Sequence, residues 1–132
     1  MRVEQWESKL HNFIESCREK PFVRGETDCG LFVADCINLL QGRDLDAGIK
    51  YRGKYKNKKE LKALMLENGH NDLIDITTEA LGKPYVNVKM SQRGDCVGFT
   101  GKEGIAIGVV DLTGKNAITT GKEQSDAPHI FK

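Results

Sequence analysis

The sequence predicts an α+β protein in which helices come first and a small antiparallel sheet follows. Several stretches within the first 81 residues carry apolar side chains at intervals of three and four, whereas from Tyr85 onward short β-branched runs alternate with glycine-containing turns. The chain has 132 residues, of which 39% are hydrophobic, and this length fits one domain spanning residues 1–132. We expect the N-terminal helices to pack on the C-terminal sheet, because each layer has to bury its apolar face.

The first helix is predicted over residues 3–18. Its apolar residues recur at the spacing of one helical face, and Pro21 ends the pattern because proline lacks the amide hydrogen that continues a helix. The following residues contain Gly25 and are interpreted as a loop, in which Thr27 or Asp28 is placed to cap the next helix.

A second helix is predicted over residues 29–40, with Gly42 as its C-terminal stop. Residues 43–57 are polar and show no period, so they are expected to form an ordered surface loop that Tyr51 and Tyr55 hold in place. No helix is predicted within this long connection.

Two further helices complete the N-terminal part. Asn57 followed by Glu60 resembles a capping box, from which a third helix runs to Gly69, and a fourth helix is predicted over residues 71–81. Short β-branched runs separated by turns then predict strands over residues 85–89, 95–99, 104–111 and 116–120. The C-terminal residues 125–132 are interpreted as either an edge strand or a loose tail.

Composition and charge exclude several classes of protein. The 20 lysines and arginines balance 19 acidic residues, so no overall field favours nucleic acid, and none is expected as a partner. The longest nearly apolar stretch, residues 104–110, is far shorter than the roughly 20 residues of a membrane span. The N-terminus has no apolar signal region, which predicts synthesis in the cytoplasm. Four cysteines without a CxxC pair predict free thiols, and neither a metal nor a cofactor is expected, because zinc-type spacings and nucleotide-binding glycine motifs are absent.

A local basic cluster occurs within this overall balance. Its members are Arg52, Lys54, Lys56, Lys58, Lys59 and Lys62. Such a cluster can contact phosphates or an acidic protein surface. The balance of charges over the whole chain favours the alternative, a solvated loop and helix edge.

The strongest candidate for chemistry is Cys29, which is placed where a loop becomes a helix. Free backbone N–H groups and the positive end of the helix dipole stabilise a thiolate there, so the pKa of the thiol is expected to fall below its usual value of about 8.5. The neighbouring carboxylate of Asp28 opposes this effect. The alternative is that Cys29 is a small apolar side chain that packs the helix face, as we expect for Cys17, Cys36 and Cys96.

Three segments form a recognisable pattern: Asp28-Cys29-Gly-Leu-Phe32 at a helix start, Arg93-Gly94-Asp95-Cys-Val97-Gly-Phe99, and Gly104-Ile105-Ala106-Ile107-Gly108. Together they resemble the NlpC-type cell-wall cysteine peptidases of the papain-like superfamily, over most of residues 6–110. The resemblance implies an NlpC-like, papain-like fold in which Cys29 attacks an amide of a peptidoglycan stem peptide. Asp28, Asp95 and Lys102 are the candidate supporting residues, and Gly94-Asp95 is expected to form a tight turn at the start of a strand, with the carboxylate accepting backbone N–H bonds.

Further residues match a narrower pattern: Trp6, Pro21-Phe22, Phe32, Asp35, Gly42-x-Asp44, Tyr51 and Gly94-Asp95. This pattern resembles a small family of phage and prophage proteins of similar length, which are often encoded among tail genes and regarded as NlpC-like. The resemblance implies a structural or adaptor protein with other tail proteins as partners. Such a protein is made in the host cytoplasm and then carried in the virion tail.

The expected general base is missing from its position. In NlpC-type enzymes a histidine lies two residues before the first glycine of the third segment, and Lys102 occupies that position here. A protonated lysine cannot accept the thiol proton, although its charge favours a nearby thiolate. His11 is expected on the surface and His70 in a turn, which leaves His129 as the candidate base.

Two main functions follow. The missing histidine favours a noncatalytic structural or adaptor role in the tail. The alternative is an active cysteine peptidase or amidase that cleaves peptidoglycan stem peptides through Cys29. A more distant option is an acyl transferase or deamidase that acts on a host protein.

Overall fold

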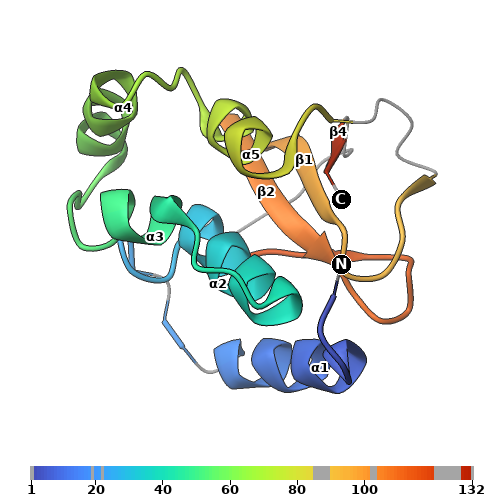
Figure 1. Cartoon of the computed structure of the whole chain (residues 1–132). Helices are drawn as coiled ribbons and strands as arrows, with labels where there is room; N and C mark the ends of the chain where they lie inside the picture. The colour runs from blue at the N-terminus through green and yellow to red at the C-terminus, as the bar shows by residue number, and fades with distance from the viewer. Residues whose placement is uncertain are drawn as a thin grey trace.

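The computed structural model describes residues 2–18, 20–21, 23–84, 90–101, 104–120 and 129–131. Within these residues, helices come first and strands follow, which confirms the predicted α+β class (Figure 1). The elements are α1 Trp6–Cys17, α2 Cys29–Gln41, α3 Asp46–Tyr51, α4 Lys58–Glu67, α5 Leu73–Leu81, β1 Cys96–Gly101, β2 Gly104–Val110, β3 Ala117–Ile118 and β4 His129–Phe131.

Helix α2 begins at Cys29 as predicted and ends at Gln41, one residue later than predicted. The carboxylate of Asp28 accepts a hydrogen bond from the Leu31 backbone N–H at 3.2 Å, so Asp28 rather than Thr27 is the N-cap. The Thr27 hydroxyl instead closes the preceding loop, where it donates to the Pro21 carbonyl at 2.6 Å. Gly42 ends the helix with a φ of 63°, a left-handed conformation that glycine adopts without steric cost.

The capping box at the start of α4 is also confirmed. The Asn57 side chain accepts from the Glu60 backbone N–H at 2.9 Å, and the Glu60 carboxylate accepts from the Lys56 backbone N–H at 3.0 Å. Helix α5 begins slightly later than predicted, because Asp72 caps it by accepting from the Asp75 backbone N–H at 3.0 Å.

The prediction of a loop over residues 43–57 is wrong in part, because this segment contains α3. A helix of six residues is less than two turns long, so it leaves no periodic pattern in the sequence. Tertiary contacts hold it instead. Tyr51 and Tyr55 are each 4% exposed and pack together with Leu31 of α2, which confirms that these tyrosines anchor the segment.

The described strands form one antiparallel sheet in the order β3-β2-β1-β4. Strand β1 lies between β2 and β4, with Gly98 opposite Ile107 on one side and opposite His129 on the other. The C-terminal residues therefore include an edge strand, one of the two forms that the sequence allowed. The strand predicted over residues 85–89 lies outside the described residues.

Helix α2 is the centre of the fold, with α1 packed along it and the sheet beyond it (Figure 1). The main core joins all three layers and includes Leu10 of α1, Phe32 and Cys36 of α2, and Cys96 and Ile107 of the sheet. The helices therefore pack on the sheet as predicted. In the described part of the chain, no helix combines the length and apolar character needed to cross a membrane.

Candidate active site around Cys29

Cys29 is the first residue of α2, and its side chain packs against the main core next to β2. Burial raises the pKa of the thiol above its ordinary value, with a further increase from the charge of Asp28. Hydrogen bonding by the Ile107 backbone and the charge of Arg24 lower the pKa by less than burial raises it. The predicted fall in this pKa is therefore wrong, because removal of the sulfur from water outweighs the helix terminus.

The carboxylate of Asp28 is 3% exposed and is occupied by three donors. The Gly25 backbone N–H donates to it at 2.9 Å, the Leu31 backbone N–H at 3.2 Å, and the Tyr55 hydroxyl also donates. Burial and this hydrogen bond raise the pKa of Tyr55. Asp28 thus fixes the loop, the start of α2 and the segment after α3 in one arrangement.

Asp95 forms a second buried anchor, at the start of β1. It accepts from the Gln92 backbone N–H at 2.8 Å and forms a salt bridge with Arg2 at 2.9 Å. The guanidinium of Arg2 also lies 4.4 Å from the centre of the Trp6 ring. The contacts of Asp95 therefore attach the N-terminal segment to the sheet.

One of the three histidines is exposed, and another takes part in a buried hydrogen-bond network. His11 is exposed on α1, as predicted. His70 is 7% exposed, and its Nδ1 lies 2.7 Å from the Tyr51 hydroxyl while its Nε2 contacts the Glu79 carboxylate. The sequence predicts only a turn at His70. A single histidine between two predicted helices does not indicate that Tyr51 and Glu79 will contact it.

His129 lies in β4, in a cross-strand row that runs from Ile107 through Gly98 to His129. Ile107 is the β2 residue whose backbone lies at the Cys29 thiol. Because neighbouring strands are about 4.8 Å apart, the backbone of His129 lies about 10 Å from that of Ile107. Lys102, the residue at the position of the expected base, lies outside the described residues.

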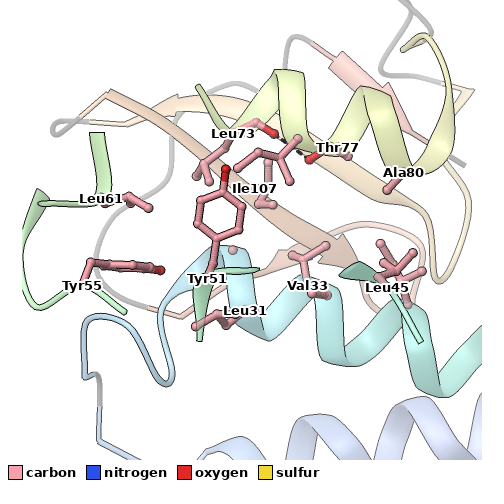
Figure 2. Close-up of a pocket in the computed structure, with 14 residues that line it drawn as sticks. Leu31, Val33, Leu45, Tyr51, Tyr55, Leu61, Leu73, Thr77, Ala80 and Ile107 are labelled. Carbon is pink, nitrogen blue, oxygen red and sulfur yellow. Dashed lines mark hydrogen bonds between the residues drawn. The ribbon is translucent and has the colours of Figure 1, made fainter. Parts of the chain in front are cut away.

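A cavity lined by Gly30, the residue after Cys29, is too small for a substrate. It measures about 40 Å³, lies between α2, α5 and β2, and has an almost entirely apolar lining that includes Gly30 and Ile107. Figure 2 shows Leu31 and Val33 of α2 on one side of it and Leu73 on the other. Among the residues that line this cavity, only Tyr51, Tyr55 and Thr77 have a polar side-chain atom. The Thr77 hydroxyl donates to the Leu73 carbonyl at 2.8 Å. This space is therefore a packing gap, since ligand pockets measure roughly 300–1,000 Å³.

Two larger clefts are present among the described residues. One of about 480 Å³ lies between the end of α1, the start of α2 and the residues after β3, and one of about 340 Å³ surrounds the Tyr51–His70–Glu79 network. Cys29 lines neither of them. The candidate nucleophile thus lies at the start of a helix, and it packs against core side chains and the β2 backbone.

Comparison with known proteins identifies a family for this chain. No curated protein and no solved structure matches the chain. A family model described as a domain of unknown function, DUF6950, matches residues 1–127. The matched residues include Cys29, Asp28 and Asp95 but end two residues before His129. Because this model spans nearly the whole sequence, the chain belongs to the DUF6950 family.

Proposed function

We propose that this protein is a noncatalytic adaptor of a phage or prophage tail, built on an NlpC-like, papain-like scaffold. The observation that carries the proposal is the environment of Cys29. Its side chain is partly buried against the core with a raised pKa, and the adjacent carboxylate of Asp28 is occupied by structural donors. A protonated thiol is a poor nucleophile.

The papain-like part of the proposal is supported by the order of the elements. A cysteine opens a central helix, that helix packs on an antiparallel sheet, and the Gly94-Asp95 turn leads into the first strand of the sheet. The tail location rests on the resemblance to phage and prophage proteins. The proposed tail location implies synthesis in the host cytoplasm and later incorporation into the virion tail. Other tail proteins are then the partners.

The adaptor proposal is tested in the phage or induced prophage that encodes the chain. The protein should be found in purified virions or tail-assembly intermediates together with a tail component. A Cys29→Ala variant should assemble at the wild-type level, since the thiol has no chemical task. Absence of the chain from both virions and intermediates would contradict the proposal.

A second candidate function is a cysteine peptidase or amidase that acts on peptidoglycan stem peptides. The register of the sheet favours it, because it places His129 in the same cross-strand row as Ile107, whose backbone lies at the Cys29 thiol. In this mechanism the imidazole takes the thiol proton and the sulfur attacks the amide carbonyl. The amine leaves with that proton, and water then hydrolyses the thioester.

The hydrolase candidate is tested with purified sacculi. Release of muropeptides by the wild type and by His11→Ala, together with loss of release in Cys29→Ala and His129→Ala, would support it. His11→Ala is the matched control because His11 is an exposed histidine of α1. No release by the wild type excludes this function and leaves the adaptor.

A further inference from the structure

Residues 52–62, here called the basic segment, concentrate the positive charge of the molecule. The segment contains six cationic side chains and one carboxylate, which gives a net charge of +5. Since the whole chain carries +1, all other residues together carry −4. The near-neutral total therefore conceals a strongly asymmetric distribution of charge.

The backbone of the basic segment is fixed to the rest of the molecule. The Gly53 backbone N–H donates to the Gly25 carbonyl at 2.8 Å, and Tyr55 is buried with its hydroxyl on Asp28. Arg52 forms a salt bridge of 2.5 Å with Asp35 and donates to the Glu26 carbonyl at 3.0 Å. These contacts hold the segment against the loop that precedes Cys29.

The lysines of the segment point the other way, into solvent. All five are exposed: Lys54, Lys56, Lys58, Lys59 and Lys62. Among the residues that the structure describes, four of these lysines have no acidic partner: Lys54, Lys56, Lys59 and Lys62. The segment thus presents a group of positive charges on a rigid support.

The position of two of these lysines is unfavourable for the helix itself. Lys58 and Lys59 lie in the first turn of α4, where the positive end of the helix dipole disfavours cations. Lys62 follows Lys58 by one turn and adds repulsion between like charges. Stability of α4 therefore does not explain why lysines occupy these positions.

We propose that the basic segment is the docking surface for an acidic segment of a partner protein. The inference rests on the proposed adaptor function and names the chemistry of its partner. A short acidic segment fits this surface better than nucleic acid does. The residues outside the basic segment carry a net charge of −4, which repels a long polyanion. The tyrosine within the segment, Tyr55, is buried, so it offers no surface on which bases stack.

The test measures binding of a fluorescein-labelled oligoglutamate peptide to the full chain by fluorescence anisotropy, at about 150 mM salt, where exposed charges are screened beyond about 8 Å. The test variant carries Lys58→Gln, Lys59→Gln and Lys62→Gln. The matched control carries Lys9→Gln, Lys83→Gln and Lys115→Gln, which removes the same charge from exposed lysines elsewhere. A DNA duplex of equal charge is titrated in parallel.

The expected result is a peptide affinity at least about tenfold weaker in the test variant and within about twofold of the wild type in the control. Equal losses in both variants, no peptide binding by the wild type, or tighter binding of the duplex would overturn the inference. The assay does not involve virions, so it separates the two proposals. Binding through the lysines by a chain that is absent from virions would refute only the adaptor function.

Discussion

The Tyr55 hydroxyl donates a hydrogen bond to the carboxylate of Asp28, 27 residues earlier in the chain. The same carboxylate caps α2, so the contact joins the basic segment to the helix start that carries Cys29. Both side chains are almost fully buried. The position of the thiol therefore depends on a residue far from it in the sequence.

Tyr55→Phe should destabilise the protein by about 1–3 kcal/mol, because a buried carboxylate loses one of its three donors. Urea unfolding monitored by circular dichroism measures this change. His11→Gln, at an exposed position of α1, is the control and should stay within about 0.5 kcal/mol of the wild type. Unchanged stability of Tyr55→Phe would show that the hydroxyl contributes nothing.

Gly25→Ala should be far more damaging than Gly69→Ala. Both glycines have positive φ, 90° and 82°, so each alanine carries the strain of a left-handed conformation, about 1–2 kcal/mol. A Cβ at Gly25 would also lie 2.2 Å from the Tyr55 carbonyl oxygen, whereas one at Gly69 meets nothing within 4 Å. The thermal midpoints should therefore fall much further for Gly25→Ala, and equal shifts would contradict the close approach.

The Glu79–His70 contact should make stability depend on pH. Hydrogen bonding and charge from His70 lower the pKa of Glu79 below its ordinary value of 4.5. A carboxylate with a lowered folded-state pKa contributes stability above the ordinary pKa, and the contribution is lost as the pH falls through the folded value. The stability difference between wild type and Glu79→Gln should thus be larger at about pH 6 than at about pH 3. Glu67→Gln, at an exposed position of α4, should show no such dependence.

Alkylation of Cys29 by iodoacetamide should be slow at neutral pH, because a raised pKa leaves the partly buried thiol protonated. The rate should keep rising above about pH 8.5, the ordinary pKa of a cysteine thiol, and reach that of a fully exposed thiol only in denaturant. Mass spectrometry of tryptic peptides measures each cysteine separately. A rate that levels off below about pH 8 would instead indicate an activated thiolate.

The sequence predicted those parts of the site that depend on neighbours in the chain. A helix cap at Thr27 or Asp28, Cys29 as the first helical residue and Asp95 in a turn all follow from residues within three positions of one another. The His70 network was missed because its partners lie 19 and 9 residues away and follow no periodic pattern. Helix α3 was missed because burial of Tyr51, rather than a repeated apolar stripe, stabilises it.

By itself, the sequence determined the α+β order, the limits of α2 and the placement of a cysteine at its start, since capping residues and apolar periodicity act locally. Only the tertiary structure decided the chemical state of that cysteine. Enclosure by the core and the β2 strand raises the pKa of the thiol, and the Tyr55 hydroxyl occupies the adjacent carboxylate. Desolvation depends on every residue packed around a group, and these residues come together only when the chain folds.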